Sequence, residues 1–322
     1  EMIKAGKKPV PLSQMYSARN VYLEKAKQYV KMHGATALGD GGSLHDALDM
    51  YRKYGALPEI VYSGLNYGTK LNDFSEMSGI RDAFLETIIK PKKGKLTPNW
   101  FTAYTAIIDA YLGTPPEKFM YEGKEYTPRT FADKVVGINP DNYVEISSFK
   151  EYPLYKQFLL PIPDNWSLGM VYNVKLTELT DIIDNALKNG YTVNWATDVS
   201  EKYFSWKNGV AYVPEKEFED MSKEEKDAMF NGPKPERVIT DDDRQLAFDN
   251  YSTTDDHGMH IVGIAKDQNG KEYYIVKNSW GESNDYKGYL YVTKAYVQYK
   301  STAILLNKAG VPSNIKNKLQ LQ

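Results

Sequence analysis

Two stretches decide the fold of this chain: HGMHIVGI at residues 257–264 and VKNSWG at residues 276–281. Between them stands Asn269-Gly270, a dipeptide typical of two-residue hairpin turns. An antiparallel hairpin brings the start of its first strand beside the end of its second. We therefore expect His257 and Asn278 to be neighbours across the ladder.

An imidazole beside a neutral carboxamide suits nucleophilic catalysis. The amide of Asn278 can accept one ring N–H of His257 and fix the tautomer, which frees the other nitrogen to deprotonate a nucleophile. Trp280 stands two residues after Asn278 and could shield that hydrogen bond from water. On spacing alone, a surface histidine near a turn asparagine is an equally good interpretation.

Composition excludes several classes of protein. The chain has 322 residues, a formal net charge of −2, 42% hydrophobic and 25% charged residues, and no cysteine. These values are those of a globular chain that buries a sizeable core, not of a disordered or disulfide-stapled one. The near-neutral charge argues against nucleic-acid binding. The sequence contains no apolar run of about 18 residues, so it predicts no membrane span.

The order of the predicted elements indicates an α+β fold of two lobes, with helices first and strands last. We place a helical lobe at residues 1–165, with an insertion at about 70–150. A strand-rich lobe follows at 166–322, with a helical insertion at about 215–250. Helices are predicted at residues 16–32, 43–55, 130–136 and 177–188, with two more helical stretches from about 73 to 111, where Thr97-Pro98 suits a helix start. Strands are predicted at 191–196, 209–213, 257–264, 272–276 and 288–292. Ser43 with Asp46 predicts a capping box for the second of these helices.

These motifs resemble those of papain-like cysteine peptidases. The His257 and Asn278 stretches correspond to the family's histidine and asparagine motifs, and Asp40-Gly41-Gly42 matches its substrate-lining glycine pair. Leu12-Ser13-Gln14 is similar to the segment after the family's nucleophile helix. KYGALPE at 53–59, the helical insertion and Val311-Pro312 resemble the bleomycin hydrolase / aminopeptidase C branch.

The resemblance implies a papain-like fold, with a helical left lobe and an antiparallel half-barrel as right lobe. It also implies aminopeptidase-like hydrolysis of peptide bonds by Cys/His/Asn catalysis. His257 would be the general base and acid, Asn278 would orient it, and Trp280 would cover the pair. The residues that would bind or support the substrate are Asp40, Gly41, Gly42 and Asp198.

The nucleophile of the family is a cysteine in Gln-x-x-x-x-x-Cys-Trp, a motif that these 322 residues do not contain. By the resemblance, Glu1 to Ala5 is the last part of the nucleophile helix and ends at Gly6. We therefore expect the cysteine about a dozen residues upstream of Glu1, or about 18 Å along a helix, and the chain alone to be inactive. The alternative is a peptide-binding or assembly paralogue that has lost the nucleophile, since Ser13 and Ser17 follow the helix and are poor substitutes.

We expect no cofactor and no metal. His260 stands three residues after His257, so on a strand the two side chains point to opposite faces and make a poor zinc site. The partners implied by the resemblance are a peptide substrate, the upstream segment and a homo-oligomer, commonly a hexamer. The sequence leaves open the side-chain specificity, the choice between exopeptidase and endopeptidase action, and the oligomeric state. The compartment is open too: the family default is cytoplasmic, and an extracytoplasmic location is the alternative, because a signal would lie in the upstream segment.

Overall fold

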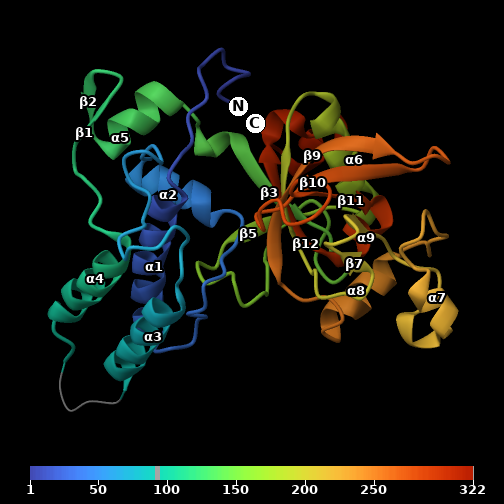
Figure 1. The fold of residues 1–322 in the computed structure, drawn as a ribbon, viewed down its shortest axis with the longest axis horizontal. Coiled ribbons are helices and arrows are strands. Elements are labelled where there is room, and N and C mark those ends of the chain that lie inside the picture. Colours follow the sequence, from blue (N-terminus) through green and yellow to red (C-terminus); the bar gives the residue numbers. More distant parts are fainter. Residues whose placement is uncertain (91–94, 322) are drawn as a thin grey trace. The chain divides into compact units, whose positions relative to one another are not determined.

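The computed structural model describes residues 1–90 and 95–321. Contacts divide the chain into two units (Figure 1): unit 1 comprises residues 1–140 and 161–169, and unit 2 comprises residues 141–160 and 170–322. The boundary that we placed after residue 165 falls inside the short return to unit 1. Unit 1 is mainly helical and unit 2 contains a large mixed sheet, as an α+β fold requires.

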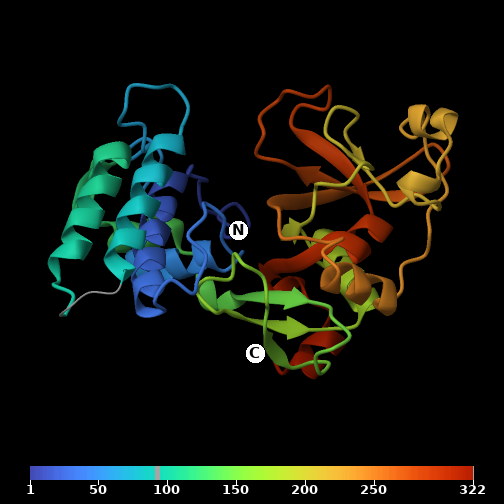
Figure 2. The same cartoon turned by 90° about the horizontal axis from the view of Figure 1, so that it is seen from below.

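Unit 1 is built on three helices, α1 (Gln14–Lys31), α3 (Ser75–Ile89) and α4 (Asn99–Leu112), which lie alongside one another in both views (Figures 1 and 2). Its core includes Ala26, Leu85 and Ile108, one from each of these helices, and all three are fully buried. The elements are α1 (Gln14–Lys31), α2 (Asp46–Tyr54), α3 (Ser75–Ile89), α4 (Asn99–Leu112), the hairpin β1 (Phe119–Tyr121) and β2 (Lys124–Tyr126), and α5 (Pro128–Phe131), which continues as a π-helical turn over Ala132–Val136.

The predicted N-cap of α2 is wrong by two residues, because His45 and not Ser43 directly precedes the helix. The carboxylate of Asp46 accepts the N–H of Ser43 at 2.9 Å, which is one half of the expected capping box. The hydroxyl of Ser43 instead donates to the Asp164 carbonyl at 3.4 Å, so the other half does not form and the helix begins at Asp46. Ser43 therefore belongs to the loop before the helix.

The first residues carry the hydrogen bonds with which a helix ends. The N–H of Lys7 donates to the Met2 carbonyl at 2.8 Å, and that of Gly6 to Ile3 at 2.9 Å. Gly6 has φ +71°, in the left-handed region. This is the Schellman pattern, with glycine in its usual place, but residues 2–6 form hydrogen-bonded turns and not an assigned helix, so the predicted helix that ends at Gly6 stays a prediction.

Unit 2 contains a ten-stranded sheet in the order β4-β5-β3-β12-β6-β9-β10-β11-β8-β7. Its neighbours are antiparallel except for the pairs β3/β5 and β8/β11. The strands are β3 (Tyr143–Ser147), β4 (Gln157–Leu159), β5 (Met170–Asn173), β6 (Val193–Thr197), β7 (Phe204–Ser205), β8 (Val210–Ala211), β9 (His257–Lys266), β10 (Glu272–Lys277), β11 (Tyr289–Thr293) and β12 (Ser301–Asn307). The α-helices are α6 (Leu176–Lys188), α7 (Lys223–Asp227), α8 (Asp241–Asp249), α9 (Lys294–Lys300) and α10 (Ser313–Leu319).

The hairpin of β9 and β10, orange in Figure 1, contains a bulge. Ile275 pairs with Gly263, but the next residue, Val276, pairs with Ile261, so Val262 has no partner opposite it. Beyond the bulge the pairing continues to Lys277 and His260. The antiparallel hairpin that the Asn-Gly turn predicts is thereby confirmed.

Two predictions about unit 2 need correction. The segment 215–250 is not continuously helical: α7 and α8 are short, and irregular chain that includes Gly232-Pro233 lies between them. The strands that were not predicted are β3, β4, β5, β7 and β12. In β12 all seven residues are buried, so it lacks the alternation that marks a half-exposed strand.

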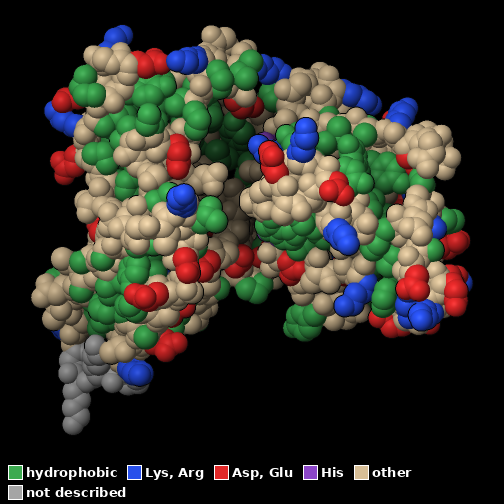
Figure 3. Space-filling model, viewed as in Figure 1, with side chains coloured by type: hydrophobic (Ala, Val, Ile, Leu, Met, Phe, Trp, Pro, Cys, Tyr) green, Lys and Arg blue, Asp and Glu red, His purple; other side chains and the backbone are tan. Residues whose placement is uncertain are grey.

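Side chains of both charge signs are interspersed over the face shown in Figure 3, in keeping with the small net charge. Within residues 1–90 and 95–321, no helix is both long and apolar enough to cross a membrane.

Candidate active site

The hairpin places His257 and Asn278 in contact. His257 is the first residue of β9, and Asn278 directly follows β10. The ring Nε2 of His257 lies 2.7 Å from Oδ1 of Asn278. Asn278 is only 6% exposed, so this hydrogen bond is held in a largely water-free environment.

A second contact fixes the direction of this hydrogen bond. Oδ1 of Asn278 also accepts the backbone N–H of Ser279 at 2.7 Å, which identifies that atom as the oxygen. An amide oxygen only accepts, so Nε2 of His257 must carry the proton. The neutral ring therefore has an unprotonated Nδ1, which is the nitrogen that can take a proton from a nucleophile.

Trp280 lies over the imidazole. The ring centroids of Trp280 and His257 are 4.9 Å apart, with 32° between the planes. Trp280 packs edge-on against Trp206, at 5.5 Å, and Phe204, at 6.2 Å. It is 43% exposed, so one part of the indole contacts His257 while another faces solvent.

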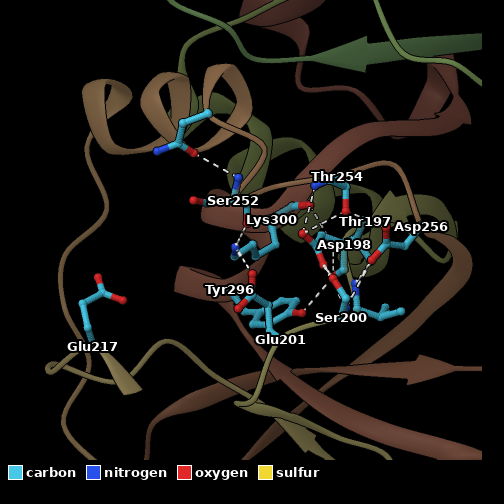
Figure 4. A network of polar contacts seen from close by, with 12 residues as sticks. Thr197, Asp198, Ser200, Glu201, Glu217, Ser252, Thr254, Asp256, Tyr296 and Lys300 are labelled. Atoms are coloured by element: carbon cyan, nitrogen blue, oxygen red, sulfur yellow. Dashed lines mark hydrogen bonds and ion pairs between the residues drawn. The ribbon is translucent and has the colours of Figure 1, made fainter. Parts of the chain in front are cut away.

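Asp198 is buried and supports the site through hydrogen bonds, instead of facing solvent. It is 1% exposed, and Figure 4 shows it at the centre of a polar network. Its Oδ1 accepts the N–H of Ser200 at 2.8 Å, and its Oδ2 accepts the N–H of Thr254 at 2.9 Å. Asp198 thus ties the loop after β6 to the segment that leads into His257.

Asp256, directly before His257, completes this tie. Its Oδ2 accepts the N–H groups of Val199 and Ser200 at 3.1 and 3.2 Å. Burial raises the pKa of Asp198. For Asp256 burial acts in the same direction, but hydrogen bonds from Thr254 and its other donors outweigh it and lower the pKa. Asp256 is thus the member of the pair that stays ionised to the lower pH.

A buried lysine anchors the other side of the network in Figure 4. Lys300 is 1% exposed, and its ammonium contacts the carboxylate of Glu201 and the carbonyl of Ser252. It stands at the junction of α9 and β12. Sequence reasoning missed Lys300, because nothing in its immediate neighbours marks it as buried.

The glycine pair lies in unit 1, on the loop between α1 and α2. Gly41 and Gly42 are exposed, yet both are in close contact with carboxylates. A Cβ on Gly41 would lie 2.5 Å from Cγ of Asp164, and one on Gly42 would lie 2.6 Å from Oδ2 of Asp46. A side chain at either position would therefore force the neighbouring carboxylate to move, apart from any role of these glycines in binding.

Asp40 is an anchor of this loop. Its carboxylate accepts from Arg81 Nη1 at 2.8 Å, from the Tyr22 hydroxyl at 3.1 Å and from the Ser78 hydroxyl at 3.1 Å. Burial favours the neutral acid, but Arg81 and the other donors outweigh it and lower the pKa of Asp40. Asp40 therefore holds the loop to α1 and α3.

His260 does not join His257. Its Nε2 lies 2.7 Å from the hydroxyl of Thr192, and burial together with Lys277 lowers its pKa. Within residues 1–90 and 95–321, no group of three or more His, Asp or Glu side chains is arranged to hold a metal ion.

Known proteins similar to this chain include several peptidases. It is 25% identical over 307 residues to aminopeptidase C of Lactobacillus delbrueckii subsp. lactis, with 88% of this chain and 65% of that protein covered. Against cysteine proteinase 1, mitochondrial, of Saccharomyces cerevisiae it is 23% identical, with 87% and 60% covered. The chain thus spans roughly two thirds or less of the length of these relatives.

A solved structure confirms the fold. The crystal structure of PepW from Lactobacillus rhamnosis HN001 matches 99% of this chain and 77% of its own, with a TM-score of 0.72 at 21% identity. The papain-like α+β fold and the resemblance to peptidases of the aminopeptidase C type are therefore confirmed. The sequence model of the Peptidase C1-like family matches residues 21–322, and the chain belongs to that family.

Proposed function

We propose that the protein carrying this chain is an aminopeptidase-like cysteine peptidase whose nucleophilic cysteine precedes residue 1. The observation that carries this proposal is the 2.7 Å contact between Nε2 of His257 and Oδ1 of Asn278. It leaves Nδ1 of His257 free for a thiol. The Schellman hydrogen bonds at residues 2–7 are in keeping with a helix that comes from upstream.

The chemistry assigned to His257 balances without a further cofactor. Nδ1 takes the proton of the thiol, and the thiolate attacks the peptide carbonyl carbon. As the tetrahedral intermediate collapses, the C–N bond breaks and Nδ1–H protonates the leaving amine. Nδ1 then deprotonates a water that attacks the thioester, and the thiol regains its proton as the acid leaves. Asn278 keeps the ring in one tautomer throughout.

Substrate binding is assigned to the exposed Gly41–Gly42 segment by its resemblance to the family motif. A bare backbone lets an extended peptide approach closely enough for main-chain hydrogen bonds. The names of several relatives describe aminopeptidases, which supports cleavage near the amino terminus of the substrate. Peptides with free and with acetylated amino termini would separate this from endopeptidase action.

The experiment is hydrolysis of a tetra-alanine fluorogenic amide by the full-length natural protein, before and after thiol alkylation. We expect alkylation to abolish activity and His257→Gln to lower kcat by at least about a thousandfold. His260→Gln is the matched control, because His260 is on the same strand but binds Thr192 instead of Asn278. Equal loss in the two variants, or activity that survives alkylation, would refute the assignment.

The absence of cysteine from these 322 residues favours one second candidate, a nucleophile-less peptide-binding paralogue. Intact mass and sequencing of the natural protein distinguish the two. A Cys-Trp motif upstream of Glu1 supports the peptidase. A natural protein without such a cysteine supports the binding protein.

A further inference from the structure

The structure contains a buried lysine at the glycine loop that the chemistry above does not use. Lys25 is on α1 and is 2% exposed. Its ammonium donates to the carbonyls of Gly39 and Gly41, each at 2.6 Å. Few lysines are this buried, because burying an ammonium disfavours its charged form. Each of the two carbonyls accepts a short hydrogen bond from this ammonium, which is charge-assisted when the lysine is protonated.

Peptide geometry gives these two bonds a directional consequence. In a trans peptide the C=O and the next N–H point in opposite directions. Because the Gly41 carbonyl points at the Lys25 ammonium, the N–H of Gly42 must point away from Lys25. Gly42 is exposed, and no acceptor for its N–H is recorded among the described residues. A positive charge at the carbonyl also polarises the peptide and strengthens that N–H as a donor.

The pKa of Lys25 is lowered overall, because burial outweighs the surrounding carboxylates. Burial lowers its pKa, while the carboxylates of Asp164, Asp46 and Asp40 raise it and Arg81 adds to the lowering. Among these carboxylates Asp164 has the largest effect, and it also lies against Gly41. The same side chain thus restrains the Gly41 backbone and partly balances the ammonium behind it.

We propose that Lys25 is a positioning residue, which fixes the Gly41–Gly42 peptide so that the Gly42 N–H donates to a backbone carbonyl of the peptide substrate. The inference rests on the proposed peptide-binding role of this segment. It adds the residue that orients this donor.

The test compares Lys25→Met with Arg19→Met. Methionine fills much the same space without charge. Arg19 is a second buried cation on α1, but its Nε donates to Asp109 of α4 at 2.6 Å and does not contact the glycine loop. Both variants remove a buried cation of the same helix together with its hydrogen bonds, so thermal unfolding should show a loss of stability in each. Only Lys25→Met should affect peptide binding.

Two readouts are needed. In the chain labelled with 15N-glycine, tetra-alanine should shift the Gly42 amide signal downfield, and Lys25→Met should lower the order parameters of Gly41 and Gly42 toward flexible values. In the full-length enzyme, Lys25→Met should raise KM for the tetra-alanine amide about tenfold, with kcat within about twofold, as for lost uniform binding. Arg19→Met should leave both readouts unchanged.

Each outcome bears on the proposal. The proposal is overturned if the Gly42 amide signal does not shift when the peptide is added. It is also overturned if the glycine loop of Lys25→Met becomes mobile while the affinity for the peptide stays constant. An equal KM effect of Arg19→Met would also overturn it, because it would reduce the role of Lys25 to general stability. A natural protein that binds the peptide through Gly42 but hydrolyses nothing would refute the proposed peptidase and leave the role of Lys25 standing.

Discussion

Gly41→Ala tests whether the glycine pair is required by its own loop. A Cβ at Gly41 would lie 2.5 Å from Cγ and 2.6 Å from Oδ1 of Asp164. The backbone of Gly41 is outside the positive-φ region, so the cost is steric and not conformational. The Asp164 carboxylate must rotate away, and we expect a loss of about 2 kcal/mol in the free energy of unfolding, within the range for overpacking.

A double-mutant cycle isolates that contact. Asp164→Ala alone should cost less than about 1 kcal/mol, because it removes a half-buried charge interaction with Lys25. In the double variant the added methyl group meets no carboxylate. Its loss in the free energy of unfolding should therefore be about 1–2 kcal/mol smaller than the sum of the two single losses. The assay is pulsed hydrogen exchange of α1 as a function of urea concentration, which follows unit 1 separately from unit 2.

Gly39→Ala is the control. No atom lies within 4 Å of a Cβ at Gly39, and its φ is not positive. That variant should be neutral or more stable by about 0.4–1 kcal/mol, because alanine restricts the unfolded chain. If Gly41→Ala behaves like Gly39→Ala, or if Asp164→Ala fails to relieve it, the steric reasoning is wrong. If the double variant regains stability but the full-length enzyme that carries it keeps a raised KM for the tetra-alanine amide, Gly41 is also needed for substrate binding.

Three further predictions concern unit 2. Asn278→Asp places a carboxylate against His257 and stabilises the imidazolium, so the alkaline limb of the pH–rate profile should move up by about one pH unit; an unmoved limb would contradict the assigned contact. Lys300→Met leaves the Glu201 carboxylate without its ammonium and should cost about 3 kcal/mol in urea unfolding, part of which Glu201→Gln should restore. Burial lowers the pKa of His260 in the folded protein, so as the pH falls the unfolded chain binds a proton at this histidine before the folded protein does. Stability should be full above about pH 6.5 and fall as the pH drops toward the folded pKa, and His260→Gln should remove that component from pH-dependent melts.

Much of the fold could be predicted because its signals are local. The helix predicted at residues 16–32 is observed at Gln14–Lys31, and the one predicted at 177–188 is observed at Leu176–Lys188. The Asn269-Gly270 turn sets the pairing of β9 and β10, and that pairing brings His257 to Asn278. For the same reason the contact between the two side chains was predictable from one sequence.

The residues that support the site were not predictable, because their roles depend on distant partners. Lys25 resembles a solvent-facing lysine of an amphipathic helix, and its burial depends on a loop that begins 14 residues later. Lys300 is paired with Glu201, 99 residues away. The expectation that Asp198 binds or supports the substrate came from the resemblance, which does not reveal that Thr254 and Ser200 donate hydrogen bonds to its carboxylate.

The bulge at Val262 means that β9 has one residue more than the paired stretch of β10 opposite it. Because Val262 has no partner on β10, a deletion at that position would leave Ile261 opposite Val276 and His260 opposite Lys277. A deletion between Val262 and His257 would instead shift His257 by one position and turn it to the other face of the sheet. Among relatives of this chain, a length difference at Val262 is thus compatible with an intact histidine–asparagine pair, whereas one nearer His257 would signal its loss.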